Sequence, residues 1–135
     1  MNAARTPAQQ ASFISPQLVK ERKREEWLAL FADDAVLEDP VGPSLFDPAG
    51  QGHRGKAAIA RFYDTIISAG GAFDFTMQAS YPCGDECANV WVGRMTGADG
   101  KVTETPMVTV YKVGGDGKIV SLRAFWDSSR LQAKR

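Results

Sequence analysis

The chain has 135 residues, of which 44% are hydrophobic and 24% are charged, and this balance predicts one globular domain over residues 1–135 with a sizeable core. Its 16 basic and 16 acidic residues give a formal net charge of +0, so charge alone gives no reason to expect a nucleic-acid or acidic-membrane partner. No apolar run approaches the ~20 residues of a membrane span, and the polar N-terminus lacks the apolar core of a secretory signal, so we expect a soluble cytoplasmic protein.

The cysteines and the histidine do not form a pattern that binds metal. Cys83 and Cys87 are separated by three residues, whereas structural zinc sites use closer pairs, and no second pair follows. We expect two reduced thiols at the end of a hairpin rather than a disulfide. His53 is the only histidine and is expected on a solvated loop. The sequence therefore predicts no metal and no cofactor.

The N-terminal third predicts helices. Thr6 followed by Pro7 is typical of a helix start. At Ser15-Pro16 the helix either kinks or starts afresh with Ser15 as its cap, and both alternatives stay open. The mixed charges of "KERKREEW" indicate a solvated helix face. A second helix is expected to be anchored by a short apolar stripe: Trp27, Leu28, Leu30 and Phe31.

The segment "FADDAVLEDPVG" ends in a predicted strand. Asp33 and Asp34 are expected to follow the helix end as solvated acids. Alternation then places Ala35, Leu37 and Asp39 on one face of the strand, with Glu38 on the other. Pro40 and Gly42 end the strand. Residues 43–54 form a long loop that carries the apolar Leu45 and Phe46, which is typical of a lid or pocket rim.

The clearest helix follows Gly55. Its apolar residues recur at helical spacing and predict one buried face: Ile59, Phe62, Tyr63, Ile66 and Ile67. Gly70-Gly71 ends the helix. Because Tyr63 lies within the apolar face, its hydroxyl is expected at the buried end or with a partner there.

The rest of the chain alternates as antiparallel strands joined by the glycine-rich turns "GADG" and "GGDG". In the last strand Val120, Leu122, Ala124 and Trp126 share the face that we expect to be covered. In the preceding strand Met107, Thr109 and Tyr111 share one face, and both faces are mostly apolar. The element order predicts an α+β fold, a curved antiparallel sheet with helices covering its concave face and a cavity between them. A sheet apolar on both faces also favours a homodimer through the convex face.

Asp39 is the residue that favours a site over simple core packing. Trp126, Tyr111 and Tyr63 by themselves are typical of a packed core. A carboxylate on the same face as Leu37, directed into an apolar cavity, is costly unless it is paired or protonated. Carboxylates in such surroundings are over-represented at functional sites.

The segments "WLALFADDAVLEDPVG", "GKAAIARFYD" and "DGKIVSLRAFW" resemble the bacterial steroid Δ5-3-ketoisomerases of the NTF2-like, or SnoaL-like, superfamily. The similarity runs from about Trp27 to Trp126. "EDPVG" preceded by "ADDA" is the fairly specific element, whereas the other two are shared across the superfamily. The loop "PSLFDPAGQGHRG" and the segment "KREEW" are more similar to actinobacterial isomerase-like proteins than to the best-studied isomerases. The resemblance implies a cone-shaped α+β fold, a steroid-like ligand and no cofactor.

The resemblance also implies roles for residues of this chain. Asp39 matches the general base, which moves a proton within a 3-oxo-Δ5-steroid. The family's oxyanion donors are a tyrosine on the first helix and a protonated aspartic acid on a late strand, and here Ser15 and Thr109 occupy those positions. Tyr63 matches a second family tyrosine. Tyr63 or Tyr111 is a candidate substitute donor.

The remaining predicted site residues line the pocket by the same match. Trp126 corresponds to an aromatic wall that packs on the steroid rings. Leu122, Ala124 and Met107 are expected to line the same cavity. The hypothesis that follows is an isomerase acting on a 3-oxo-Δ5-steroid or related enone.

Two alternatives stay open. The first is a non-catalytic module that binds a steroid or another apolar molecule, and the second is a polyketide-cyclase-like enzyme. The Arg-x-Asp segment of related epoxide hydrolases is missing, since Met95 and Thr96 follow Arg94. The histidines of related dehydratases are missing as well.

Overall fold

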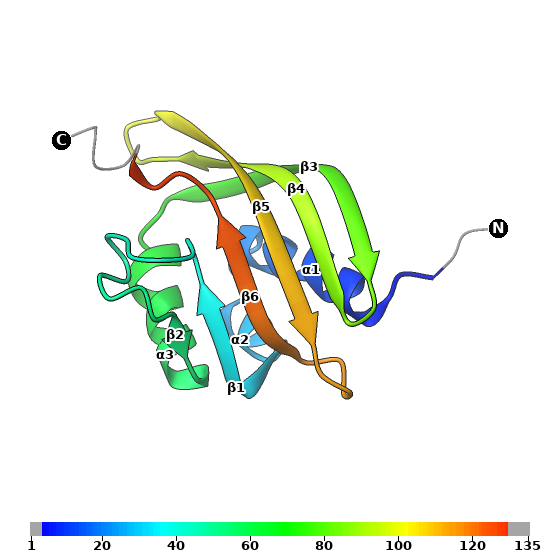
Figure 1. The fold of residues 1–135 in the computed structure, drawn as a ribbon. Helices are drawn as coiled ribbons and strands as arrows, with labels where there is room; N and C mark the ends of the chain where they lie inside the picture. The colour runs from blue at the N-terminus through cyan, green and yellow to red at the C-terminus, as the bar shows by residue number, and fades with distance from the viewer. Residues whose placement is uncertain (1–3, 130–135) are drawn as a thin grey trace.

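The computed structural model describes residues 4–129, which form one curved sheet with the helices gathered on its concave side (Figure 1). The helical elements are α1 (Pro7–Lys20), α2 (Arg24–Leu28), α3 (Lys56–Phe62) and the π-helical turn η1 (Tyr63–Ile67). The strands are β1 (Phe31–Glu38), β2 (His53–Arg54), β3 (Ala72–Cys83), β4 (Glu86–Thr96), β5 (Val102–Val113) and β6 (Ile119–Phe125). The α+β architecture predicted from the element order is therefore confirmed.

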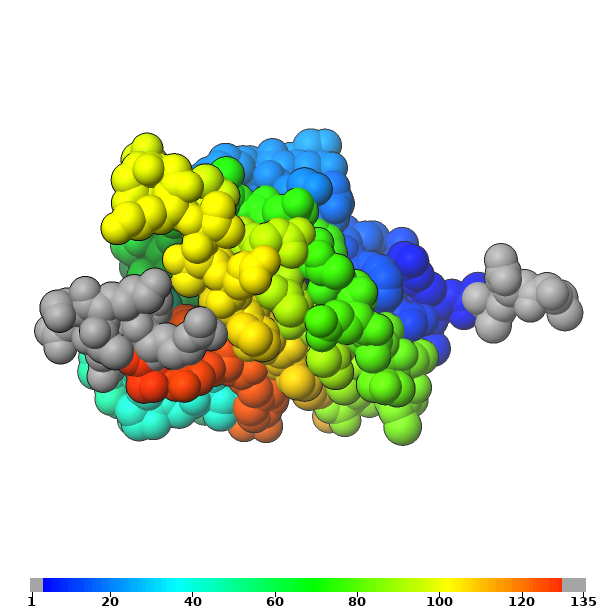
Figure 2. Space-filling model, turned by 90° about the horizontal axis from the view of Figure 1, so that it is seen from above, coloured from blue at the N-terminus to red at the C-terminus, as the bar shows by residue number. Residues whose placement is uncertain are grey.

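The six strands form one sheet in the order β2-β1-β6-β5-β4-β3. From above, β3 to β6 form adjacent bands coloured from green to red (Figure 2). The sheet is mixed rather than purely antiparallel, because β1 and β6 pair in parallel, with Leu37 opposite Leu122. Alternation predicts strands but does not say which distant strand lies beside β1. That parallel pair is what brings the end of β1 next to the end of β6.

Helix α1 runs without interruption through Pro16. Its first turn is capped as predicted, since the Thr6 hydroxyl accepts a hydrogen bond of 3.1 Å from the Gln9 N–H. Pro16 has no backbone N–H, so it leaves the Ser12 carbonyl without its helical donor but does not end the helix. A new helix starting at Ser15 is therefore wrong. Ser15 lies inside α1 and is buried.

The second helix is shorter than predicted. It ends at Leu28, and Phe31 is already the first residue of β1. The Leu30 carbonyl accepts a hydrogen bond of 2.8 Å from the Ile119 N–H, so the chain at this point already pairs with the end of the sheet. Asp33 and Asp34 consequently lie within β1, exposed, and not after a helix end.

The predicted helix after Gly55 consists of α3 and η1. Ile59 and Phe62 are buried in α3, as the apolar spacing predicts. In η1 the Ser68 N–H bonds to the carbonyl of Tyr63, five residues earlier, at 2.8 Å. Such π-turns occur often at functional sites. The wider turn keeps Tyr63 in the core while Ile66 and Ile67 reach the cavity described below.

A buried cluster of hydrogen-bonded polar side chains joins α1 to the sheet. Asn89 on β4 is fully buried, and its Nδ2 donates to the Ser12 hydroxyl at 2.8 Å. Its Oδ1 accepts from Ser80 at 2.6 Å and from the thiol of Cys87 at 3.3 Å. Gln9 of α1 donates to Ser80 at 3.1 Å. The polar groups of the cluster are hydrogen-bonded to one another. The cluster therefore fixes where α1 crosses the sheet.

The two cysteines lie at the β3–β4 hairpin as predicted. Cys83 is exposed and Cys87 is buried, and both are free thiols. Among the described residues, no helix is long and apolar enough to cross a membrane.

Candidate functional site

A cavity of about 510 Å³ lies between the concave face of the sheet and the helices. Side chains of α1, α3, η1, the loop after β1 and strands β3 to β6 line it, and most of them are apolar. This volume falls within the range of small-molecule sites, roughly 300–1,000 Å³. The polar groups in its wall therefore decide what kind of ligand it accepts.

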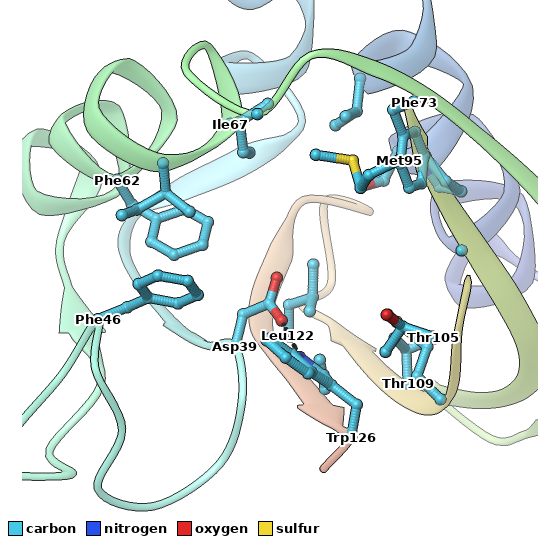
Figure 3. A pocket seen from close by; sticks show the side chains of 18 of the residues that line it. Asp39, Phe46, Phe62, Ile67, Phe73, Met95, Thr105, Thr109, Leu122 and Trp126 are labelled. Carbon is cyan, nitrogen blue, oxygen red and sulfur yellow. Dashed lines mark hydrogen bonds between the residues drawn. The ribbon is translucent and has the colours of Figure 1, made fainter. Parts of the chain in front are cut away.

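Asp39 follows the last residue of β1 and points into this cavity (Figure 3). Its Oδ1 accepts a hydrogen bond of 2.6 Å from the indole N–H of Trp126, the residue after β6. The Val41 N–H bonds to the Ala124 carbonyl at 2.9 Å, so the chain stays beside β6 after β1 ends. The parallel β1–β6 pair thus positions both the carboxylate and its indole donor.

Burial is the main influence on the Asp39 carboxyl. It raises the pKa of Asp39 above its ordinary value, while the hydrogen bond from Trp126 and the nearby charge of His53 lower the pKa by less. Its ionised form is thus held in a poorly hydrated place, with one hydrogen-bond donor among the described residues. A carboxylate in this state is a stronger base than one in water.

His53 does not lie on a solvated loop, as the sequence suggested, but in the short strand β2 opposite Leu37. Its ring packs on Phe62 with a centroid distance of 4.8 Å. Its Nε2 is buried and has no hydrogen-bond partner among the described residues. Two residues of β2 give no readable alternation, so the sequence carried no signal for this placement.

Thr109 lies on the same cavity-facing side of the sheet as Asp39, two strands away. Ala124 of β6 pairs with Thr109 of β5, and Ala124 lies beside the chain at Asp39. Two strand spacings therefore separate Thr109 and Asp39, about 10 Å between backbones. Ala124, which lies between them, has the smallest side chain of the three.

The Thr109 hydroxyl accepts a hydrogen bond of 3.1 Å from the indole N–H of Trp91. Thr109 is buried and lines the cavity. The indole occupies an oxygen lone pair, and no acceptor for the hydroxyl hydrogen is found among residues 4–129. Trp91 was not singled out from the sequence, although alternation along β4 puts it on the face of buried Cys87 and Asn89.

Besides Asp39 and Thr109, the cavity wall contains a third polar group, in which the hydroxyls of Ser15 and Tyr111 are hydrogen-bonded to each other. The Tyr111 hydroxyl donates to the Ser15 hydroxyl at 2.9 Å, and the indole N–H of Trp27 donates to the same oxygen at 3.0 Å. Burial raises the pKa of Tyr111 above its ordinary value, the bond to Ser15 lowers it, and the charge of Asp39 raises it further. Tyr111 therefore stays a neutral hydroxyl.

The structure brings together most of the predicted site residues and leaves one outside. The following residues line the cavity: Asp39, Ser15, Tyr111, Thr109, Met107, Leu122, Ala124 and Trp126. Tyr63 does not line it, and its ring instead packs on Trp27 at a centroid distance of 5.5 Å in the core. This placement favours Tyr111 over Tyr63 as a donor to a ligand.

Of the predicted loop at residues 43–54, one residue lies in the cavity wall, as the apolar residues of that loop suggested. Phe46 lines the cavity and lies 6.3 Å from the Trp126 ring, between centroids. Leu45 next to it remains 63% exposed. Within residues 4–129, no group of three or more His, Cys, Asp or Glu side chains is placed to hold a metal ion.

Comparison with known proteins agrees with this geometry. The family model described as a SnoaL-like domain matches residues 13–122, most of the chain. The chain belongs to the SnoaL-like family. It is 35% identical to a curated steroid Delta-isomerase of Nocardioides simplex over 98 residues, which are 73% of this chain and 72% of that protein.

Solved structures of SnoaL-like relatives superpose on nearly the whole chain. The Δ5-3-ketosteroid isomerase from Mycobacterium sp. is 39% identical, with a TM-score of 0.85 over 93% of this chain and 96% of that one. RV0760c from Mycobacterium tuberculosis, in complex with estradiol-17beta-hemisuccinate, is 37% identical, with a TM-score of 0.85 over 93% and 97% of the two chains. The predicted resemblance to steroid isomerases is thus confirmed.

Proposed function

We propose that this SnoaL-like protein isomerises a 3-oxo-Δ5-steroid or a related β,γ-unsaturated ketone, with Asp39 as the general base. The observation that carries the proposal is the Asp39 carboxylate in an apolar cavity, hydrogen-bonded by the Trp126 indole and with a pKa raised by burial. The identity with a steroid Delta-isomerase supports it.

In the proposed reaction, Asp39 takes the proton from the carbon between the ketone and the double bond. The C–H electron pair forms a dienolate whose negative charge rests on the ketone oxygen. Electrons then return from that oxygen, the far carbon of the double bond takes the proton from Asp39, and a conjugated enone results. No atom is gained or lost, so the reaction needs no cofactor. The proton moves along one face of a flat ring, which a single carboxylate is able to serve.

The direct test is turnover of 5-androstene-3,17-dione, followed by the ultraviolet absorbance of the conjugated product. We expect turnover by the wild-type protein that Asp39→Asn removes. The absence of turnover, with the steroid shown to bind, would exclude the proposal in favour of the binding module below.

Trp126 allows a test through pH. Its indole hydrogen bond lowers the pKa of Asp39, so Trp126→Phe is expected to raise that pKa further while keeping an aromatic wall. The rise of kcat/KM with pH follows ionisation of the base and should move to higher pH in the variant. At pH values well above the midpoints of both proteins, kcat/KM of the variant should be closer to that of wild type than at pH values near the midpoints. If the pH midpoint of the rise in kcat/KM is the same in wild type and variant, Asp39 is not the titrating base.

A non-catalytic steroid-binding module is the second candidate. It is favoured by the replacement of both family oxyanion donors, at Ser15 and Thr109, by weaker aliphatic hydroxyls. The likeness to RV0760c, crystallised with a steroid derivative, is compatible with it. Tight binding of a phenolic steroid such as equilenin without any turnover of the enone identifies this alternative.

We also propose that a second copy of the chain covers the convex face of the sheet. Val108 and Phe125 pair across β5 and β6 and are 37% and 40% exposed there. Arg123 and Glu38 form an ion pair of 3.0 Å on the same side of the sheet. Native mass spectrometry is expected to give twice the chain mass, and Val108→Glu is expected to reduce it to the monomer. A wild-type monomer at micromolar concentration would contradict the proposal.

A further inference from the structure

The charged segment "KERKREEW" contains one cation, Arg22, that has no acidic partner among residues 4–129. The other cations of the segment each form an ion pair: Lys20 with Asp74, Lys23 with Glu21 and Arg24 with Asp64. The Arg22 guanidinium instead donates to two backbone carbonyls, that of Ser68 at 3.3 Å and that of Gly71. These acceptors are neutral, so they hold the guanidinium in place but leave its positive charge without a counter-charge.

The backbone of Arg22 adopts a conformation that usually selects glycine. Its φ is 57°, the one positive value at a non-glycine residue in the described part of the chain. The Arg22 N–H bonds to the Val19 carbonyl and the Lys23 N–H to the Leu18 carbonyl, which together form the Schellman motif of a helix end. Glycine takes this position without steric cost, whereas arginine does not. An unfavourable conformation of this kind indicates a role for the side chain.

Arg22 also lies in the wall of the cavity. Three residues of α1 line the cavity, Ser15, Pro16 and Val19, and Arg22 follows Val19 just beyond the end of the helix. In the described part of the chain, Asp39 and Arg22 are the two charged side chains of the cavity lining. Arg22 is exposed, so it lies at the rim of the cavity and not in its interior.

The contacts of Arg22 place it at the end of the cavity away from Asp39. Gly71, which accepts from Arg22, lies against the end of β4, since a Cβ on Gly71 would come within 2.4 Å of the Thr96 carbonyl oxygen. Met95, the residue before Thr96, lies across the cavity from Asp39 (Figure 3). Arg22 is therefore on the Met95 side of the cavity.

Strand β5 gives the scale of this separation. Thr96 pairs with Val102 at the beginning of β5, and Thr109, further along β5, is the residue that lies two strands away from Asp39. From Val102 to Thr109 the strand rises about 23 Å, and the curvature of the sheet makes the direct path shorter. The cavity thus has a negative group at one end and a positive group at the other, with apolar residues between them.

We infer that Arg22 binds a carboxylate on the ligand, at the end remote from the ketone, and that the substrate class is a 3-oxo steroid with an acidic side chain. The inference deepens the proposed function by naming this class, and it rests on that function in placing the ketone at Asp39. Because Arg22 lies at the rim, the acid must extend beyond the rings that fill the apolar cavity and stands on a side chain.

The chemistry of the guanidinium suits a carboxylate. It has five N–H groups, and the carbonyls of Ser68 and Gly71 engage two of them, so donors remain for a ligand. A planar guanidinium matches the two oxygens of a carboxylate with parallel hydrogen bonds. The two backbone bonds also orient the side chain before the ligand arrives, which lowers the entropic cost of binding.

The opposite charges at the two ends favour one orientation of the ligand. A carboxylate that entered toward Asp39 would be repelled by a like charge, whereas at Arg22 it meets an opposite charge. An acid on the side chain therefore directs the ketone, at the other end of the rings, to the Asp39 end of the cavity.

The test compares an acid with its own methyl ester. The probes are 3-oxochol-4-en-24-oic acid and its methyl ester, which share the rings and a ketone that is already conjugated. Their dissociation constants are measured by quenching of tryptophan fluorescence. The wild-type protein is expected to bind the acid about threefold to tenfold more tightly, the worth of an exposed charge-assisted hydrogen bond. This preference should shrink at high ionic strength. Equal affinities at low ionic strength would contradict the inference.

Substitution of Arg22 should remove the preference for the acid. Arg22→Gln is expected to bind acid and ester alike, and Arg22→Lys to keep part of the preference, because lysine retains the charge without the planar fork. The ratio of the two affinities is taken within each variant, so a change in the shape of the cavity affects both probes and cancels. A preference that survives in Arg22→Gln would overturn the inference.

Arg22→Gly is a second variant, chosen to suit the backbone. Glycine adopts a φ of 57° without strain, so the end of α1 should hold although the bonds to Ser68 and Gly71 are lost. This variant should lose the preference for the acid as completely as Arg22→Gln. A preference retained in Arg22→Gly would also contradict the inference.

Lys23→Gln is the matched control. Lys23 is the next cation along the chain, but it pairs with Glu21 at 3.5 Å and does not line the cavity. The exchange removes the same charge from nearly the same place, and the preference for the acid should remain. An equal loss in Lys23→Gln and Arg22→Gln would show that the acid responds to surface charge in general, and the inference would be wrong.

Turnover distinguishes this inference from the proposed function. With the unconjugated 3-oxochol-5-en-24-oic acid as substrate, Arg22→Gln should change KM more than kcat, because Arg22 lies far from the reacting atoms. Loss of the acid preference in Arg22→Gln without turnover in the wild-type protein supports the carboxylate site and rejects the isomerase. Turnover that needs Asp39, with acid and ester bound equally well, supports the isomerase and overturns the carboxylate site.

Discussion

Asp39→Asn is expected to lower kcat for enone isomerisation by about 100- to 10,000-fold, the usual contribution of a positioned general base. The amide has nearly the shape of the carboxylate and still accepts from the Trp126 indole through its oxygen, so the cavity should survive. Binding of the conjugated ketone should therefore change little. Rates are measured by enone absorbance, and affinity by fluorescence quenching.

Glu38→Gln is the matched control for that experiment. Glu38 is the neighbouring acid and the last residue of β1, but it points to the other face, where it pairs with Arg123 at 3.0 Å. The exchange removes one negative charge from nearly the same place in the chain without touching the cavity. Turnover should stay within about twofold of wild type, because an exposed ion pair contributes little. An equal loss in both variants would show that Asp39 acts through overall charge and not as a base.

The pH dependence of the free energy of unfolding should also reflect the Asp39 carboxyl. Burial raises the pKa of Asp39 in the folded protein above its ordinary 3.8, so the folded state holds the proton more tightly than the unfolded chain. The stabilising contribution of the protonated group is complete below pH 3.8 and is lost as the pH rises through the folded-state pKa. Asp39→Asn removes this loss. Its free energy of unfolding, relative to wild type, should therefore increase from acidic to neutral pH, as urea titrations at several pH values would measure.

Asn89→Ala is expected to lower the free energy of unfolding by roughly 2–4 kcal/mol. The exchange removes a fully buried amide and leaves Ser12, Ser80 and Cys87 without their common partner. Because those groups stay buried, their lost hydrogen bonds are not replaced by water. Urea denaturation measures the change. Since the cluster fixes the position of α1, which carries Ser15, ligand affinity should fall as well.

Ser80→Ala is the control for the Asn89→Ala experiment. Ser80 is only partly buried and lies at the outer end of the same cluster, so its removal should cost less than half as much as that of Asn89. Equal losses for the two variants would mean that Asn89 acts through the Ser80 end and not by holding α1.

Much of the site followed from alternation along the strands. Leu122, Ala124 and Trp126 of the last strand, with Met107, Thr109 and Tyr111 of the one before, line the cavity as their parity predicts. The period of two places every second side chain on one face, and the apolar character of that face identifies the covered side. The start of β6 is the exception. A register shift in its pairing with β5 buries Ile119 completely and leaves Val120 partly exposed, whereas we expected Val120 on the covered face.

Long-range pairing was beyond what local patterns predict. The parallel β1–β6 pair, the strand at His53 and the continuity of α1 through Pro16 depend on contacts between residues far apart in the chain. The resemblance to the isomerases left Tyr63 and Tyr111 as two candidate substitute donors and did not choose between them. Only the packing of η1 turns Tyr63 toward Trp27 and leaves Tyr111 in the cavity wall.

The sequence by itself determined the fold class, the strand faces and the carboxylate that stands among apolar residues. These depend on local periodicity and on the cost of burying a charge, both of which are written in neighbouring residues. The tertiary structure decided which groups meet Asp39 and Ser15. A hydrogen bond such as that from Trp27 to Ser15, or from Trp126 to Asp39, joins side chains on different elements, and only the packed arrangement of those elements fixes its distance and direction.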